Sequence, residues 1–86
     1  MVVDYDGSQD LDTTVVRFTA EWCGPCKAFA PVFNKIAEQN DETYVVVDVD
    51  EYPEVAQEYR VMSIPAVFDH GQRVMDYTNW ARTELS

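Results

Sequence analysis

The sequence predicts a single α/β domain over residues 1–86. Two runs rich in β-branched residues, VVRFTA at 15–20 and TYVVVDVD at 43–50, have the length and composition of buried strands. A helical pattern separates them at 27–39, and turn-forming residues later in the chain indicate a β-hairpin. Strand, helix, strand, short helix and hairpin therefore follow one another, which is the order of an α/β fold.

Composition narrows the class of protein. With 86 residues, 47% of them hydrophobic, the chain is long enough for one core. It has neither an apolar run of transmembrane length nor the pattern of a signal peptide, so we expect a cytoplasmic, reducing setting. The net charge of -10 argues against nucleic acid and anionic membranes as partners. A basic docking patch on another protein remains compatible with it.

In the first half of the chain, residues 1–5 are expected to form a short edge strand that ends in the turn-prone residues 6–8. At most one helical turn precedes the strand at 15–20. The helix at 27–39 carries an apolar stripe, and Pro31 within it is expected to bend the helix rather than end it.

In the second half, the run at 43–50 is continuous enough in β-branched residues for a central parallel strand. A short helix is expected to start around Pro53, followed by a loop at 60–65. Residues 66–68 and 73–77 are expected to pair as a hairpin around a turn at 69–72. A last helix is expected to begin near Trp80 and to end after about one turn.

The two cysteines, Cys23 and Cys26, are the only ones in the chain and lie where the first long helix is expected to begin. A helix N-terminus favours a thiolate at the first sulfur, and the second sulfur lies on the same face within reach. This pattern indicates a disulfide that opens and closes. A metal site would normally need four ligands, and the only histidine, His70, is expected in an exposed turn. A cluster shared by two such cysteine pairs in a dimer is the metal alternative.

Four landmarks together resemble the thioredoxin family: WCGPCK at 22–27, VVVDVD at 45–50, the dipeptide Ile64-Pro65, and the hairpin from Phe68 to Gly71. Their spacings agree from Thr14 to about Tyr77. The resemblance implies a thioredoxin fold, with a central mixed β-sheet flanked by helices. It also implies truncation at both termini, with a short first helix and a minimal last helix.

The resemblance further implies a protein-disulfide reductase that a thioredoxin-reductase-type electron donor recharges, with no cofactor beyond the Cys23–Cys26 disulfide. Cys23 would be the exposed nucleophile and Cys26 the buried resolving thiol. The motif residues Trp22, Gly24 and Pro25 would shield and shape the site. A loop with Ile64 and a cis Pro65 would form the groove for the substrate backbone.

Arg17 departs from the family pattern, because thioredoxins usually have a buried aspartate at this position. A buried arginine needs a partner, and Asp48 on the neighbouring strand is the candidate. We hypothesise that Arg17 favours the thiolate of Cys26 and so raises the reduction potential. The alternative is that Arg17 extends to solvent and has no redox role.

Asn79 and Trp80 are a second departure, since the family has a small Gly-Ala pair beside the substrate groove there. Asn79 can adopt a left-handed backbone. Trp80 either narrows the groove and contacts substrate, or covers apolar surface that the short C-terminus leaves bare. The short termini also predict an open part of one sheet face and a possible dimer through it. Compact thioredoxins of this kind resemble those of viruses of bacteria, which would place the protein in a host cytoplasm.

The sequence leaves a second class of function open. The fold would then serve as a binding or accessory module of a larger enzyme, with the redox activity of the cysteines secondary. Loss of disulfide-reducing activity on substitution of Cys23 distinguishes the enzyme from the module.

Overall fold

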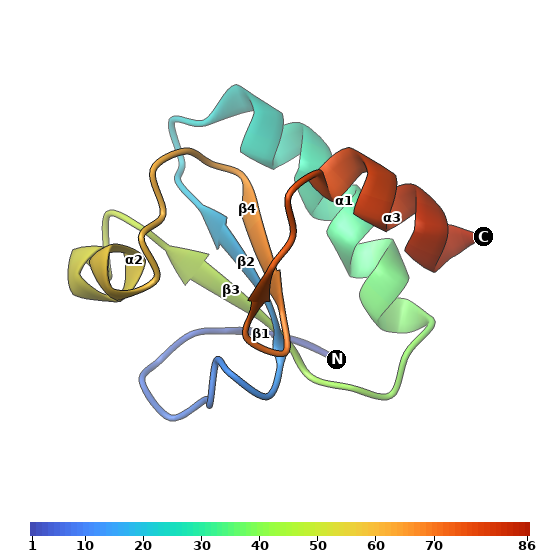
Figure 1. Cartoon of the computed structure of the whole chain (residues 1–86), viewed down its shortest axis with the longest axis horizontal. Coiled ribbons are helices and arrows are strands. Elements are labelled where there is room, and N and C mark those ends of the chain that lie inside the picture. Colours follow the sequence, from blue (N-terminus) through green and yellow to red (C-terminus); the bar gives the residue numbers. More distant parts are fainter.

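The computed structural model describes all residues, 1–86, as a five-stranded mixed sheet with three helices (Figure 1). The elements in chain order are β1 (Val2–Asp4), β2 (Val15–Thr19), α1 (Gly24–Glu38), β3 (Tyr44–Asp48), α2 (Pro53–Glu58), β4 (Ala66–Asp69), β5 (Gln72–Arg73) and α3 (Tyr77–Leu85). The predicted thioredoxin fold, with its mixed sheet flanked by helices, is confirmed. None of the helices has the length and apolarity needed to cross a membrane.

The sheet has the order β1-β3-β2-β4-β5. β3 runs parallel to both β1 and β2, whereas β4 is antiparallel to β2 and to β5. The run predicted as a central parallel strand is therefore flanked on both sides, as its β-branched composition requires. β1 is the edge strand expected at the N-terminus.

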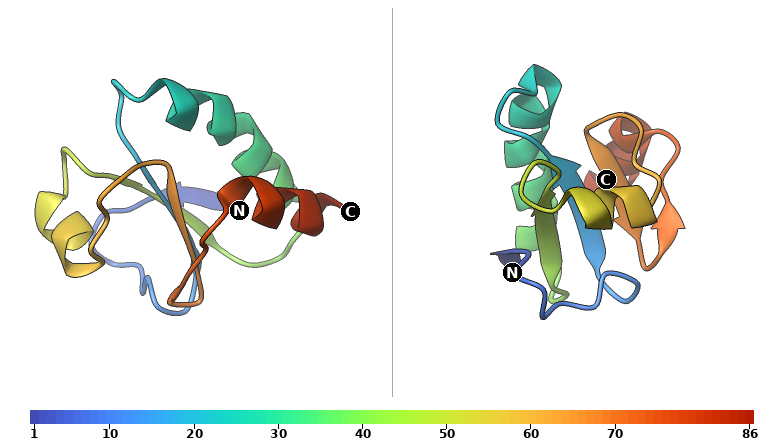
Figure 2. Two further views of the ribbon diagram at one scale, coloured as in Figure 1. Left: turned by 45° about the horizontal axis from the view of Figure 1, so that its top comes forward. Right: turned by 90° about the vertical axis from the view of Figure 1, so that its left-hand side faces the viewer.

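Two apolar cores lie on the two faces of the sheet because strand side chains alternate between faces. On one face Val15, Tyr44 and Val67 pack against α1 and α3, with Phe33 at the centre. On the other face Phe18, Val45 and their neighbours pack beneath α2. Figures 1 and 2 show α1 and α3 together on one side of the strands and α2 on the opposite side.

The first long helix, α1, begins at Gly24, so the cysteine motif opens the helix as predicted, three residues ahead of the apolar pattern at 27–39. Cys23 is its N-cap, and Pro25 occupies an early position where the missing N–H costs nothing. Pro31 lies inside the helix, which continues past it to Glu38 as expected. The cysteine pair is thereby part of the first turn of α1.

The C-terminal segment differs from the prediction. The returning strand ends at Arg73 instead of Tyr77, and the last helix spans nine residues instead of one turn. The cause is Asp76, whose Oδ1 accepts a hydrogen bond from the N–H of Asn79 at 3.1 Å and caps the helix. The prediction of a minimal last helix is therefore wrong.

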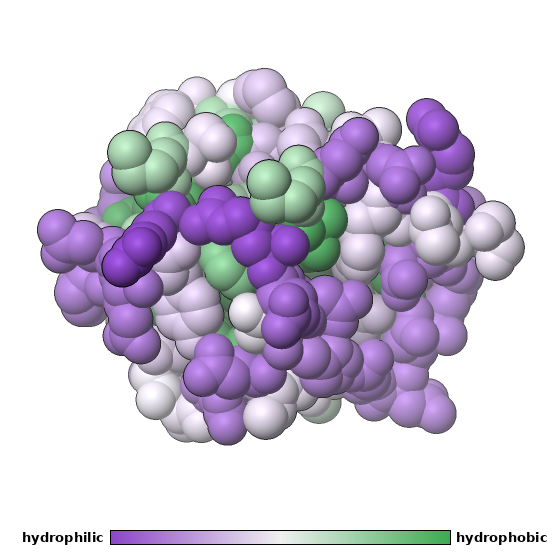
Figure 3. Space-filling model, viewed as in Figure 1, coloured by the Kyte–Doolittle hydropathy of each residue, from purple (hydrophilic) through white to green (hydrophobic).

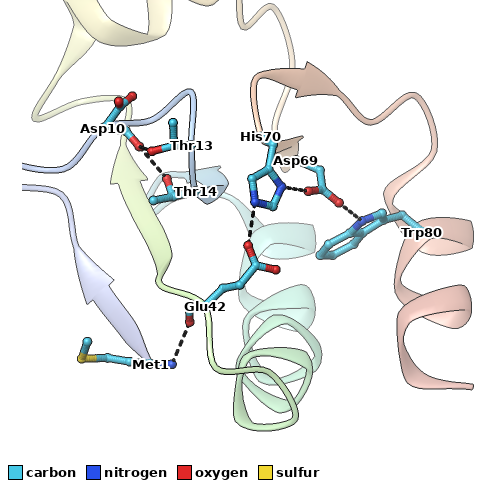
Figure 4. Close-up of polar contacts among 8 residues, drawn as sticks. All are labelled: Met1, Asp10, Thr13, Thr14, Glu42, Asp69, His70 and Trp80. Atoms are coloured by element: carbon cyan, nitrogen blue, oxygen red, sulfur yellow. Dashed lines mark hydrogen bonds and ion pairs between the residues drawn. The ribbon is translucent and has the colours of Figure 1, made fainter.

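The β4–β5 turn is exposed, as predicted. His70 and Gly71 both have positive φ, 51° and 83°, which is the backbone of a type I′ hairpin turn. The His70 imidazole lies between two carboxylates, with Nε2 2.6 Å from Glu42 Oε1 and Nδ1 2.6 Å from Asp69 Oδ1 (Figure 4). The turn is thus tied to the loop before β3.

The helix that the family places before β2 is absent here, as the short N-terminal segment predicts. The face of the sheet that such a helix would cover is nevertheless covered. The loop before β2 places Leu11 in the core on the α2 side. Tyr59 packs on Phe18 and Phe68 of the same face, and its hydroxyl donates to Asp12 Oδ1 at 2.8 Å. The expectation of an open sheet face is therefore wrong for this side.

Candidate active site

The Cys23–Cys26 pair forms a disulfide at the N-terminus of α1, with 5.3 Å between the two Cα atoms. Cys23 Sγ accepts a hydrogen bond from the N–H of Cys26 at 3.2 Å. Cys26 has no exposed surface and Cys23 keeps only 4%, so the expectation of an exposed Cys23 is wrong for the disulfide state, although Cys23 is the less buried of the two. In the reduced state this N–H and the helix N-terminus favour the thiolate at Cys23, since both place positive charge at its sulfur.

Trp22 precedes the disulfide as an exposed aromatic residue, with 69% of its surface accessible. Its indole Nε1 donates to Oδ2 of Asp50 at 2.8 Å, which fixes the ring against the turn that follows β3. Asp50 is a site residue that the sequence did not single out.

The Ile64-Pro65 peptide bond is cis, as the resemblance implies. The loop that carries it lies against the disulfide, with the Ile64 carbonyl oxygen 3.8 Å from Cys23 Sγ. A reduced Cys23 thiol has a hydrogen-bond acceptor there. Ile64 also packs against the small apolar cluster of Ala20, Cys23 and Cys26.

The structure separates Asn79 and Trp80 from the cis-proline loop. Both lie within α3, where Asn79 has helical backbone rather than the left-handed conformation considered for it. The hollow beside Pro65, of about 240 Å³, is lined instead by residues of the hairpin end, among them Val74, Met75 and Tyr77. Because α3 begins at Tyr77, the residues that line this hollow come before the positions 79 and 80 that the family resemblance implied.

Trp80 instead packs into the core between α1 and β4. Its ring lies 6.4 Å from that of Phe33, and its Nε1 donates to Asp69 Oδ2 at 3.3 Å (Figure 4). Of the two alternatives for this residue, the structural one holds, because Trp80 covers apolar surface and does not line the groove.

Arg17 lies in the middle of β2 with only 7% of its surface exposed, so it does not extend to solvent. The predicted pair with Asp48 is not formed, since Asp48 Oδ1 accepts hydrogen bonds from the N–H groups of Asp50 and Glu51. Its guanidinium instead lies over the Phe33 ring, 5.5 Å from the centroid, and its Nε is buried without a partner. Burial lowers the pKa of Arg17, and the Asp4 carboxylate opposes that effect.

Two methionines that the sequence did not single out are exposed in the segments on either side of the cis-proline loop and hairpin. Met62, two residues before Ile64, is 92% exposed, and Met75, beside Pro65, is 88% exposed. Figure 3 shows hydrophobic surface in the upper part of the molecule, where the loop before β4 and the start of α1 lie. The only feature of the sequence that could have pointed to Met75 is that it is an apolar residue in the segment 73–77, which was expected to be a strand.

No group of three or more His, Cys, Asp or Glu side chains within the chain is arranged to hold a metal ion. His70 lies in the hairpin turn, paired with carboxylates, and Cys23 and Cys26 are bonded to each other. The arrangement at the cysteines is suited to two-electron thiol–disulfide exchange.

A model of the thioredoxin family matches residues 5–85 of this sequence. The chain belongs to the thioredoxin family. The match extends well beyond the cysteine motif on both sides and includes the hairpin and α3, so the positions of Arg17 and Trp80 lie within the matched region.

Individual thioredoxins agree with this assignment. The chain is 50% identical over 54 residues to the thioredoxin of Mycoplasmoides gallisepticum, a match that covers 62% of this chain and 54% of the relative. It is 43% identical over 75 residues to the thioredoxin of Staphylococcus aureus, covering 83% of this chain and 72% of the relative. The chain thus spans about half the length of the first of these relatives.

The structure is also similar to a crystal structure of a thioredoxin from Nicotiana alata, with a TM-score of 0.74 and 30% sequence identity. That similarity covers 98% of this chain and 90% of the other. The core of the thioredoxin fold is therefore retained in 86 residues.

Proposed function

We propose that this protein is a thiol–disulfide oxidoreductase that reduces disulfides of other proteins through a Cys23/Cys26 dithiol–disulfide cycle. The observation that supports it most is the disulfide itself, which lies at the N-terminus of α1 and faces the cis-proline loop. Membership of the thioredoxin family supports the same reaction class.

The reaction begins with the reduced dithiol. Only a thiolate attacks a disulfide, and a free cysteine with a pKa near 8.5 is mostly protonated at neutral pH. The α1 N-terminus and the Cys26 N–H at 3.2 Å favour the thiolate form of Cys23, so a larger fraction of this cysteine is ready to attack. The Cys23 thiolate attacks one sulfur of the substrate disulfide, forms a mixed disulfide and expels the other substrate sulfur as a thiolate.

The second step belongs to Cys26. As a thiolate it attacks the Cys23 sulfur, closes the Cys23–Cys26 disulfide and releases the remaining substrate sulfur. Two electrons have then passed from the protein dithiol to the substrate, whose two leaving thiolates take up protons. Cys26 has no exposed surface, whereas Cys23 keeps a small exposed fraction and lies beside the cis-proline loop, so Cys23 is the sulfur that substrate reaches first.

Substrate binding is assigned to the loop around Ile64 and Pro65 and to the hollow beside it. An extended segment of substrate would lie there next to Cys23, along the hollow that Met75 lines, and the exposed Met62 precedes the same loop. Methionine suits a site with several protein substrates because its side chain is flexible and polarizable.

The cycle needs a source of two electrons. We assign this role to a thioredoxin-reductase-type donor, whose own thiolate would attack Cys23 and expel Cys26 as the leaving group. A dimer remains a prediction. The surface available for it is the apolar groove between α1 and α3, of about 470 Å³ and lined by residues that include Phe29, Tyr77 and Leu85.

A disulfide-reduction assay tests the proposal. The native protein should accelerate the precipitation of insulin by a dithiol reductant, and Cys23→Ser should abolish the acceleration. Lys35→Ala, on the same helix and away from the disulfide, is the control that should retain full activity. Absence of activity in both the native protein and the control would favour an accessory binding module.

A further inference from the structure

Arg17 is the one buried charged residue in the protein. In the oxidised state no neighbouring group compensates the positive charge of its side chain. The guanidinium forms no ion pair and no hydrogen bond, and its Nε is buried without a partner. Contact with the Phe33 ring, 5.5 Å from the guanidinium carbon, offsets only part of the free energy that burying an unpaired ion costs. The oxidised protein therefore holds an uncompensated cation.

A cavity of about 260 Å³ joins this cation to the active site. It lies between α1 and the carboxyl ends of β2 and β3, and Arg17 and Cys26 both line it. Cys26 is fully buried on its other sides. A negative charge that appears on the Cys26 sulfur during reduction therefore faces the same cleft as the unpaired guanidinium.

We propose that Arg17 is the charge partner of the Cys26 sulfur in the reduced protein. It acts as a positioning residue, and the inference rests on the proposed dithiol–disulfide cycle. When an electron donor attacks Cys23, the Cys23–Cys26 bond breaks and Cys26 leaves with the bonding electron pair as a thiolate. Arg17 stays protonated throughout and compensates that charge, whereas any proton that Cys26 later binds comes from water.

The other charged groups around the cavity do not take this role. Asp48 of β3 is held by two backbone N–H groups, and Glu21, before α1, is exposed. Lys27 of α1 is also exposed, so solvent screens its charge. Asp4 of β1 influences Arg17 but does not line the cavity. Among these charges the guanidinium is the least screened, and it opposes the net charge of -10 of the chain.

A Cys26 thiolate stabilised by Arg17 is a better leaving group, so an electron donor that attacks Cys23 opens the disulfide faster. Stabilisation of the reduced form also raises the reduction potential, which makes the protein a weaker reductant than one without this cation.

The first measurement isolates Cys26 in a Cys23→Ser background and titrates its thiolate by ultraviolet absorbance. Replacing Arg17 by Met should lower the ionisation constant of Cys26 at least about tenfold, one pKa unit, and Arg17→Lys should restore most of it. Arg17→Met removes an unpaired buried charge, so the variant should fold. Arg17→Gln provides a second neutral variant, and Lys35→Met, which removes an exposed cation from α1, is the matched control for loss of positive charge.

The second measurement equilibrates the protein with Cys23 and Cys26 intact against glutathione. Arg17→Met should shift the equilibrium constant about tenfold toward the oxidised protein, about 30 mV to a more negative potential. An unchanged Cys26 ionisation in folded Arg17→Met and Arg17→Gln, or a larger effect from Lys27→Met, would overturn the proposal. The titration needs no turnover, so it remains decisive for Arg17 even if the insulin assay shows no activity.

Discussion

The backbone N–H of Cys26 donates to Cys23 Sγ at 3.2 Å, within the first turn of α1. The same geometry that holds the disulfide therefore also favours a thiolate at Cys23 once the bond is open. Cys26 has no comparable donor and is enclosed by protein. This asymmetry assigns attack on substrate to Cys23 and release of substrate to Cys26.

Cys26→Ser tests that division of roles. The variant keeps the nucleophile but has no resolving thiol, so we expect it to bind about one equivalent of substrate as a stable mixed disulfide and not to turn over. Mass spectrometry under non-reducing conditions measures the adduct. Cys23→Ser is the matched control and should form almost none, because Cys26 is buried; equal adduct formation by both variants would contradict the assignment.

Arg60 offers a prediction on stability. It follows α2 with a φ of 54°, the left-handed conformation that glycine adopts most easily. The N–H of Val61 donates to Ala56 O at 2.9 Å and that of Arg60 to Gln57 O at 3.1 Å, the two bonds of a Schellman motif. Arg60→Gly removes a penalty of about 1 to 2 kcal/mol and adds an entropic cost of about 0.5 to 1 kcal/mol.

We therefore expect Arg60→Gly to raise the free energy of unfolding by about 0.5 to 1 kcal/mol, as measured by urea denaturation. The guanidinium of Arg73 donates to the carbonyl oxygens of Tyr59 and Arg60, and these bonds survive the change. Gln57→Gly, within α2, should instead lower stability by about 1 kcal/mol. A loss of stability in Arg60→Gly would show that its side chain has a role beyond the turn.

His70 makes part of the stability depend on pH. The hydrogen bond to Asp69 raises the pKa of His70, and the Glu42 carboxylate adds to that effect (Figure 4). Because the pKa in the folded state lies above the unfolded value of 6.5, the contribution is complete below pH 6.5. It is lost as the pH rises through the pKa of the folded protein.

His70→Asn removes the charge but keeps a residue that tolerates positive φ. We expect the native protein to be more stable than the variant at pH 6 and this difference to shrink by about pH 9, in urea denaturation at both pH values. High salt should reduce the difference at the lower pH, since the imidazole is exposed. A difference that is constant with pH would exclude the ion pairs as its cause.

The residues that the sequence located correctly are those whose local chemistry decides their structure. The β-branched runs that became β2 and β3 have no competing conformation, and Cys23 at the start of an apolar helical stripe marks the beginning of α1. The segment 73–77 does have a competitor, because its β-branched and aromatic residues suit a strand while Asp76 caps a helix. Packing of Tyr77 on Phe29, at 4.7 Å between ring centroids, favours the helix.

The environment of Arg17 could not be predicted for a different reason. Asp48 shares its side of the sheet, but the Asp48 carboxylate is used by the turn that follows β3. Sequence spacing indicates which side chains share a face, whereas competition between backbone and side-chain partners is decided only in three dimensions. The same holds for Trp80, whose place in the core depends on where α3 begins.

The last prediction separates the core from the groove. Trp80 is half-buried against Phe33, so Trp80→Ala should lower the free energy of unfolding by about 2 to 3 kcal/mol, somewhat less than for a fully buried aromatic residue. Because Trp80 lies away from the hollow beside Pro65, the kcat/KM for insulin should stay within about twofold of the native value under conditions where the variant is folded.

Met75→Ala should have the opposite profile. Its side chain is 88% exposed, so its removal should change stability by less than about 0.5 kcal/mol. The side chain lines the hollow beside Pro65, and loss of its apolar contact with an extended substrate should raise KM severalfold while leaving kcat unchanged. Weakened substrate binding in Trp80→Ala together with unchanged binding in Met75→Ala would contradict this assignment. Substrate would then contact Trp80 in α3, and the hollow beside Pro65 that Met75 lines would not be the substrate groove.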